Sequence, residues 1–167
     1  MKSNWDTYYL KLCYEAASKS KDNSTKVGCY IVGGANQVIS MGFNGMPIGV
    51  NDNDKSRYER PKKYFFFEHA ERNAIYFAAR NGTSILPDCK LYVNSIPCAD
   101  CARGIIQCGI KQVIYHGLAD EIFKKNPKWE ESVNNTLEMF YEAGVKIKTI
   151  HDNLGCEALI GGKTYEV

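Results

Sequence analysis

The sequence alternates between helical and strand patterns over residues 69–116, HAERNAIYFAARNGTSILPDCKLYVNSIPCADCARGIIQCGIKQVIYH. Its apolar spacing predicts a helix over about Phe67–Asn81, a strand over Lys90–Asn94, a helix over Cys98–Cys108 and a strand over Lys111–His116. Gly82 and Gly109 follow the two helices, and glycine is common directly after a helix end. Such alternation is typical of a sheet whose parallel strands are joined by helices.

The residues before this stretch predict a helix, a hairpin and a long loop. Apolar residues recur at three- and four-residue steps in a segment that ends near Ser20, which predicts one buried helical stripe made of Trp5, Tyr8, Tyr9, Leu12, Cys13, Ala16 and Ala17. Val27–Gly33 and Gln37–Phe43 are rich in β-formers and predict an antiparallel hairpin. The polar loop over Asn44–Pro61 is longer than about 12–15 residues, and loops of that length are usually functional or disordered.

A third helix–strand pair follows, with a helix over about Lys128–Ala143 and a strand over Val145–Ile150. The whole order is therefore helix, hairpin and three helix–strand repeats, which predicts an α/β fold with a mixed sheet covered by helices on both faces. The residues after His151 give no clear prediction. We expect a single domain over residues 1–167.

Composition and charge exclude several classes of protein. The chain has 167 residues, 44% of them hydrophobic, and a formal net charge of +2. Its apolar runs are shorter than the ~18–20 residues of a membrane span, and Met1–Asp6 lacks the apolar stretch of a signal peptide, so we expect a cytoplasmic protein. Balanced charge argues against a large basic surface for nucleic acid or anionic membrane.

The seven cysteines point to reduced thiols rather than a disulfide framework, because their number is odd and no export signal is seen. Most of them show no pairing pattern, and Cys29, Cys89 and Cys108 are interpreted as small core residues. Cys98 and Cys101 do form a pair, in the pattern Cys-x-x-Cys.

Two short motifs carry the chemistry of the chain. His69-Ala70-Glu71 precedes Pro97-Cys98-Ala99-Asp100-Cys101 by 29 positions, and together they match the H-x-E…P-C-x-x-C signature of zinc deaminases. Alone, each would be weak, since a Cys-x-x-Cys pair is also a redox motif. One imidazole and two thiolates leave the fourth tetrahedral position open, as in catalytic zinc sites. We expect the first turn of each helix to stabilise its ligands, with Pro97 in the first turn.

Glu71 distinguishes an enzyme from a fold stabilised by zinc. It lies two positions after His69, about 200° round an ideal helix, so it need not bind the same metal ion. It is free to act as general acid and base on a water at the metal. Without the zinc ligands, Glu71 would be interpreted as an acidic residue that stabilises the helix dipole.

From about Trp5 to Ile150 the chain resembles the deoxycytidylate deaminases of the cytidine deaminase superfamily. The resemblance rests on the stretches WDTYY (5–9), STKVG (24–28), GFNGMPIG (42–49), HAERNAI (69–75) and PCADC (97–101). FAARNG (77–82) is similar to phage members in particular.

The resemblance implies a three-layer α/β/α fold with a five-stranded mixed sheet. It implies hydrolysis of dCMP to dUMP and ammonia, which supplies dUMP for dTMP synthesis, and assembly into a homohexamer. Activation by dCTP with Mg²⁺ and inhibition by dTTP are implied as well. We expect one Zn²⁺ per subunit, because no second ligand set is recognised in the sequence.

The same resemblance assigns roles to individual residues. His69, Cys98 and Cys101 would bind zinc, and Glu71 would shuttle the proton. The backbone of Ala70 would hold the pyrimidine carbonyl, the Ile96 carbonyl would accept the exocyclic amine, and Asn44 would contact the 3′-hydroxyl. Asn44 is also interpreted as a turn former, because Asn-Gly is a strong turn signal. Effector binding is implied for the backbone of Gly45, Pro47 and Gly49, where glycine permits close approach to a nucleotide.

Arg80 is a candidate for the substrate phosphate. It lies 11 residues after His69, which returns it to within ~20° of the same helix face with a rise of ~16 Å. Its side chain points back toward the helix N-terminus and could bind a dianionic phosphate. The alternative is an arginine that stabilises the helix C-terminus. Asn73 and Lys26 are further candidates for substrate contacts.

Three alternatives stay open. A deaminase of the same fold could act on tRNA adenosine or on single-stranded nucleic acid, although balanced charge argues against it. The substrate range could include dCTP as well as dCMP. A non-catalytic zinc- or nucleotide-binding regulator would not need Glu71.

Overall fold

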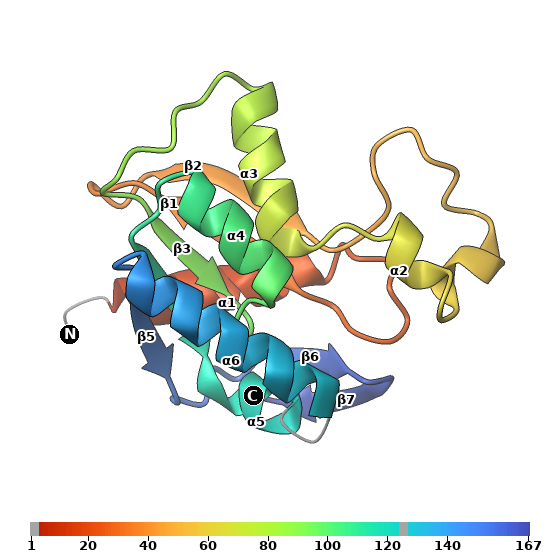
Figure 1. Ribbon diagram of the computed structural model, residues 1–167. Coiled ribbons are helices and arrows are strands. Elements are labelled where there is room, and N and C mark those ends of the chain that lie inside the picture. The colour runs from red at the N-terminus through yellow and green to blue at the C-terminus, as the bar shows by residue number, and fades with distance from the viewer. Residues whose placement is uncertain (1–3, 124–126) are drawn as a thin grey trace.

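A five-stranded mixed sheet forms the middle of the molecule (Figure 1). The computed structural model describes residues 4–123 and 127–167. The strands are β1 (Gly28–Val32), β2 (Val38–Phe43), β3 (Lys90–Val93), β4 (Gln112–His116) and β5 (Lys146–Ile150), in the order β2-β1-β3-β4-β5. β1 is antiparallel to β2 and β3, whereas β3, β4 and β5 are parallel to one another. The predicted hairpin and mixed sheet are confirmed.

The helices confirm the three predicted helix–strand repeats and add shorter elements. They are α1 (Trp5–Ala17), the 3-10 helix η1 (Lys55–Tyr58), α2 (Lys63–Phe66), α3 (Ala70–Arg80), α4 (Ala99–Gln107), α5 (Gly117–Phe123) and α6 (Pro127–Glu142). α3 leads to β3, α4 to β4 and α6 to β5, as the sequence predicts. The sequence did not predict η1, α2 and α5. No helix of the described ranges combines the length and the apolar character needed to cross a membrane.

Alternate side chains of the sheet enter two separate cores. Leu91 and Val93 pack with Ala74 of α3, Ile105 of α4 and Phe140 of α6. Tyr92, between them in the chain, packs in the other core, which contains residues of α1 and α5. Because side chains alternate along a strand, this division places helices on both faces and gives the expected three layers.

The buried face of α1 agrees with the prediction at Tyr9, Cys13, Ala16 and Ala17 and differs from it at other positions. Trp5 and Tyr8 are 45% and 49% exposed, while Leu10 and Tyr14 are buried. Tyr14 shares a hydrogen bond with His116 Nδ1 at 2.7 Å, so its hydroxyl group has a polar partner inside the core. Apolar spacing alone located the helix, but it did not fix the rotation of the helix about its axis.

The predicted loop forms an excursion that projects from the sheet, at the right of Figure 1. We call residues 44–67 the excursion; it contains η1 and α2. At its base, Gly45 and Glu68 exchange backbone hydrogen bonds of 3.0 and 2.8 Å. Lys63 Nζ lies 2.5 Å from Asp22 Oδ2, and both residues are buried. A buried charge is stable only when it is paired, so this ion pair holds α2 against the body of the protein.

The residues after His151 form a second, two-stranded sheet. β6 (Glu157–Ile160) and β7 (Lys163–Glu166) pair antiparallel, and Gly161 and Gly162 connect them with φ values of 61° and 79°. Two successive positive φ values are typical of a type I′ turn, which strongly favours glycine. Leu154, Ala158 and Ile160 pack in the core that contains α1.

Candidate active site

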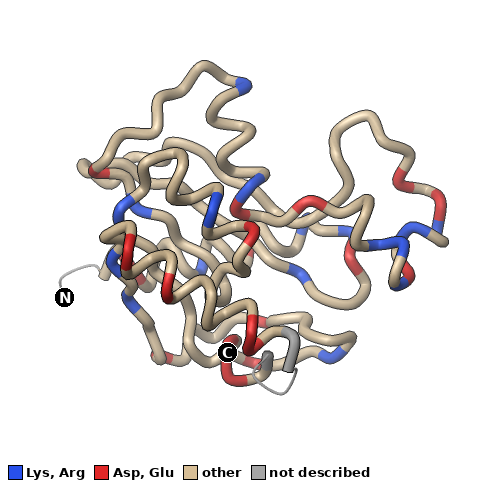
Figure 2. The backbone as a smooth tube through the Cα atoms, viewed as in Figure 1, with Lys and Arg blue, Asp and Glu red and all other residues tan. Residues whose placement is uncertain are grey.

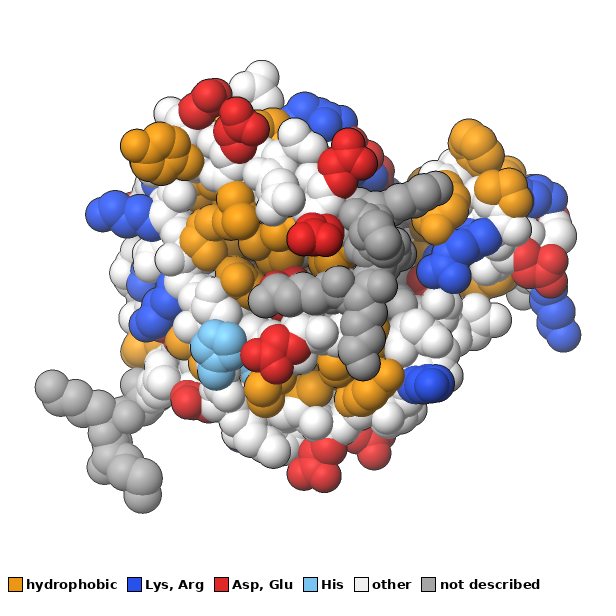
Figure 3. Space-filling model, turned by 60° about the horizontal axis from the view of Figure 1, so that its bottom comes forward, with side chains coloured by type: hydrophobic (Ala, Val, Ile, Leu, Met, Phe, Trp, Pro, Cys, Tyr) orange, Lys and Arg blue, Asp and Glu red, His pale blue; other side chains and the backbone are white. Residues whose placement is uncertain are grey.

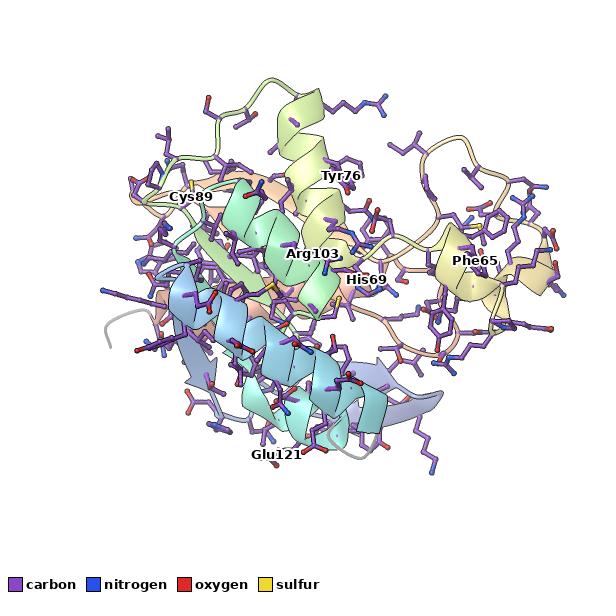
Figure 4. All side chains as sticks on the ribbon, viewed as in Figure 1. Phe65, His69, Tyr76, Cys89, Arg103 and Glu121 are labelled. Carbon is purple, nitrogen blue, oxygen red and sulfur yellow. The ribbon has the colours of Figure 1, made fainter. Side chains whose placement is uncertain are left out.

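The predicted metal ligands meet where α3 and α4 begin. Figure 4 shows His69 at the start of α3, beside the first turn of α4. His69 and Cys98 are the N-cap residues of α3 and α4, with extended backbones, and Cys101 lies in the first turn of α4. This corrects two expectations, because His69 and Cys98 precede the first turn and Pro97 lies one residue before the cap. The candidate ligand side chains therefore lie at the N-terminal ends of both helices.

The three ligand atoms are spaced as zinc requires. His69 Nδ1 lies 3.4 Å from Cys98 Sγ and 3.4 Å from Cys101 Sγ, and all three atoms lie within 4.8 Å of one another. A tetrahedral zinc ion with ordinary Zn–N and Zn–S bonds would hold nitrogen and sulfur about 3.6 Å apart. The residues therefore fit Zn²⁺, and three protein ligands leave one position open for chemistry.

The two thiols have opposite electrostatic environments. Hydrogen bonding to Cys101, and then to His69, lowers the pKa of Cys98 to about 4. The contact with Cys98, together with burial, raises the pKa of Cys101 well above its usual value. Cys98 is therefore the stronger acid of the pair. Because zinc binds the thiolate form, metal binding would favour deprotonation of both thiols.

Glu71 is buried beside the ligands, with 4% of its surface exposed. Burial raises the pKa of its carboxyl group, and the charge of the nearby His69 is the largest effect in the opposite direction. A carboxyl group with a raised pKa can both take and give a proton near neutral pH. The structure thus gives Glu71 the environment of a general acid and base.

A cavity of about 770 Å³ opens over this cluster, which is within the usual range for small-molecule sites. His69, Cys98 and Glu71 line it, together with the predicted substrate residues Asn44, Ala70 and Ile96. The structure therefore brings the predicted reacting groups and three of the predicted contacts into one space.

Asn44 is held firmly at the edge of this cavity. Its Oδ1 accepts from Val27 N at 2.8 Å, and its Nδ2 donates to Thr25 O at 2.8 Å and to Asp22 Oδ2 at 3.1 Å. These bonds fix the side chain and explain its burial. These bonds give Asn44 a structural role at the edge of the cavity, and its predicted contact with the sugar stays a prediction.

The other predicted contacts lie outside this cavity. Asn73 Nδ2 donates to Phe43 O at 2.8 Å, and Arg80 is exposed at the C-terminal end of α3. Lys26 lines a second cavity of about 520 Å³. The structure does not bring these three residues to the metal ligands, and their roles stay predictions.

Sequence reasoning missed four cations that line the cavity: Arg60, Lys63, Arg72 and Lys163. It also missed Ser132 of α6, which accepts a 3.0 Å hydrogen bond from Ala99 N beside the ligand Cys98. Arg60, Lys63, Ser132 and Lys163 carry no local motif, because they reach the site from other parts of the chain, whereas Arg72 lies within the HAERNAI stretch and was not singled out. The polar composition of the excursion was the one available signal, and it pointed only to a functional loop.

Arg72 joins the starts of the two helices. Its Nε donates to Glu68 Oε1 at 2.5 Å, and its Nη1 lies 3.9 Å from Asp100 Oδ2 in the first turn of α4. This bridge links the residue before His69 to the Cys-x-x-Cys turn. It therefore helps to hold the ligands at their spacing.

The fold and this site define a zinc-binding deaminase. A family model described as the cytidine and deoxycytidylate deaminase zinc-binding region matches residues 3–117, which include His69, Glu71, Cys98 and Cys101. The chain belongs to this family.

Within the family, the similar proteins include deoxycytidylate deaminases. The chain is 37% identical over 147 residues to an uncharacterized deaminase of Aliivibrio fischeri, covering 88% of this chain and 94% of that one. It is 37% identical over 116 residues to deoxycytidylate deaminase of Homo sapiens, covering 66% of this chain and 64% of that protein. The crystal structure of dCMP deaminase from cyanophage S-TIM5 has a TM-score of 0.66 at 25% identity, covering 90% of this chain and all of that one.

Proposed function

We propose that this protein hydrolyses dCMP to dUMP and ammonia. The observation that carries the proposal is the buried Glu71 beside the His69, Cys98 and Cys101 cluster, in a cavity large enough for a nucleotide. The deoxycytidylate deaminases among its relatives favour dCMP as the substrate. The product would supply dUMP for dTMP synthesis.

Each part of the site has a role in this reaction. Zinc bound by His69, Cys98 and Cys101 would supply a water acidic enough to attack the pyrimidine near neutral pH. Glu71 takes one proton from the attacking water and delivers it to the ring nitrogen. It then takes the remaining proton of the new hydroxyl group and delivers it to the amine, which leaves as ammonia when the C–N bond breaks. Ala70 is the first residue of α3, where backbone N–H groups lack helical partners, so it can donate to the pyrimidine carbonyl. The Ile96 carbonyl accepts from the exocyclic amine.

An ammonia-release assay tests this function. We expect the zinc-loaded protein to release ammonia from dCMP with a higher kcat/KM than from dCTP, cytosine-containing single-stranded DNA or adenosine-containing tRNA. Release from dCTP at a similar kcat/KM would favour the wider nucleotide range. No release from any of these substrates would contradict the proposal and favour a non-catalytic regulator.

Charge distribution favours a nucleotide over a nucleic acid as the substrate. Figure 2 shows Lys and Arg interspersed with Asp and Glu along the backbone, and the net charge is only +2. Binding to a nucleic acid backbone usually requires a predominantly basic surface. A few placed cations suffice for a single phosphate.

We also propose allosteric control through Gly45, Pro47 and Gly49, with dCTP and Mg²⁺ as activator and dTTP as inhibitor. These residues begin the excursion, and Gly45 exchanges backbone hydrogen bonds with Glu68, next to the ligand His69. A nucleotide bound there could therefore shift the start of α3.

Kinetics of dCMP hydrolysis test this control. We expect sigmoidal dCMP saturation that becomes steeper and more active with dCTP and Mg²⁺, and that is depressed by dTTP. A zinc-loaded enzyme that gives the same hyperbolic curve with and without these nucleotides would contradict the proposal.

A homohexamer is supported by exposed apolar side chains on the excursion. Ile48, Tyr64 and Phe65 are 68%, 67% and 84% exposed, and Figure 3 shows hydrophobic side chains gathered on the projecting part at its right. Exposed apolar groups of this kind are typical of association surfaces. A location in the cytoplasm, that of the host if the chain is phage-encoded, completes the proposal.

A further inference from the structure

The hairpin β6–β7 forms one wall of the active-site cavity. Gly161, Lys163 and Tyr165 line the same space as His69 and Glu71. The matched family region ends at residue 117, so this wall comes from a part of the chain beyond that region. The hairpin is therefore a candidate for setting which substrates this particular chain accepts.

Backbone hydrogen bonds fix the hairpin in this position. Lys26 N donates to Leu159 O at 3.0 Å, and Gly162 N donates to Ser24 O at 2.7 Å. Gly161 N donates to Thr25 Oγ1 at 3.1 Å. The turn is thus attached to the segment that carries Thr25, whose carbonyl also holds Asn44. The backbone of a wall attached in this way loses little conformational entropy when a ligand binds.

The cations that line the cavity fall into two pairs. Lys63 is neutralised by Asp22, and Arg72 is neutralised by Glu68 and Asp100. In residues 4–123 and 127–167, no ion pair involves Arg60 or Lys163. The cavity therefore has two positive charges without a carboxylate partner, one on the excursion and one on the hairpin.

We propose that Lys163, assisted by Arg60, binds the 5′-phosphate of the substrate and makes the enzyme specific for a nucleotide over a nucleoside. This inference rests on the proposed function and adds the residue that binds the phosphate. A dianionic phosphate between the two walls would gain charge-assisted hydrogen bonds from both. Arg80 does not line the cavity. To bind the same phosphate, it would have to reach the substrate from outside the cavity.

Lys163→Gln tests the assignment through two competitive inhibitors, dUMP and deoxyuridine, which differ only in the phosphate. We expect the KM for dCMP and the inhibition constant of dUMP to rise about tenfold or more, the usual range for a lost charged hydrogen bond. The inhibition constant of deoxyuridine, kcat and zinc content should stay within about twofold, because the phosphate contact lies away from the reacting atoms. Arg60→Gln should act in the same direction.

Lys146→Gln is the matched control, because Lys146 is exposed on β5 and does not line the cavity. It should change neither inhibition constant. Equal rises for dUMP and deoxyuridine in Lys163→Gln would mean a structural role and overturn the inference. So would a phosphate-specific loss in Arg80→Ala with none in Lys163→Gln.

The two proposals can fail separately. If wild-type protein releases no ammonia from dCMP, the proposed function fails. Calorimetric titration of the zinc-loaded protein with dUMP and deoxyuridine still tests Lys163: weaker dUMP binding in Lys163→Gln supports the phosphate site, and unchanged binding overturns it.

Discussion

Glu71→Gln is expected to lower kcat for dCMP deamination by about 10²–10⁴-fold, the usual contribution of a general acid or base. The amide fills nearly the same buried space, but it cannot accept and deliver a proton. Because His69, Cys98 and Cys101 are unchanged, the zinc content should stay at one ion per subunit. Ammonia release and elemental analysis of the same preparation give both values.

Two variants complete this experiment. Cys101→Ala should lose both zinc and activity, which separates loss of the metal from loss of the proton carrier. Glu138→Gln, at an exposed position on α6, should leave both values unchanged. Substantial activity in zinc-loaded Glu71→Gln would exclude the proposed role. Glu71 would then be interpreted as an acidic residue that stabilises the start of α3.

Gly42→Ala is expected to reduce the free energy of unfolding by about 3 kcal/mol, at the upper end of the cost of overpacking. A methyl group at Gly42 of β2 would lie 2.5 Å from the Ala74 nitrogen and closer still to the Ala70 carbonyl oxygen. Both are backbone atoms of α3, so the helix itself must move. Since His69 and Glu71 lie at the start of α3, kcat should fall as well.

Gly104→Ala provides the control for the same chemical change. A methyl group there would meet Ile75 and Arg72 side chains at 3.6 and 3.7 Å, which is ordinary contact, within the helix α4. Alanine is the better helix former by about 0.5–1 kcal/mol, so this variant should be at least as stable as wild type. Urea unfolding of both variants measures the difference, and equal stabilities would show that α3 is not packed directly on β2.

The cluster of His69, Cys98 and Cys101 could be predicted because its signal is local. His69, Cys98 and Cys101 each lie at the start of a helix that the apolar pattern itself predicts. The strands were predictable for a similar reason, since β-rich runs such as Gly28–Val32 are bounded by turn residues. Helix boundaries could be predicted less closely. The apolar pattern begins the helix at about Phe67, whereas in the structure α2 ends at Phe66 and α3 begins at Ala70.

The walls of the cavity could not be predicted, because they depend on contacts between distant residues. Lys163 reaches the site only through the attachment of its hairpin to Ser24 and Thr25. The Gly161-Gly162 pair between two β-rich runs was a usable hairpin signal, but it says nothing of where the hairpin docks. The burial of Tyr14 on α1 similarly involves a distant partner, because its hydroxyl group shares a hydrogen bond with His116.

The buried ion pair of Asp22 and Lys63 should constrain substitutions at two positions that are distant in the sequence. Replacing either residue alone leaves a buried charge without a partner, whereas replacing both by apolar residues of similar volume is often tolerated. Substitutions at these positions should therefore arise jointly or not at all in lineages that keep the excursion. Divergence of the excursion is thus limited by Asp22, a residue that precedes the first strand.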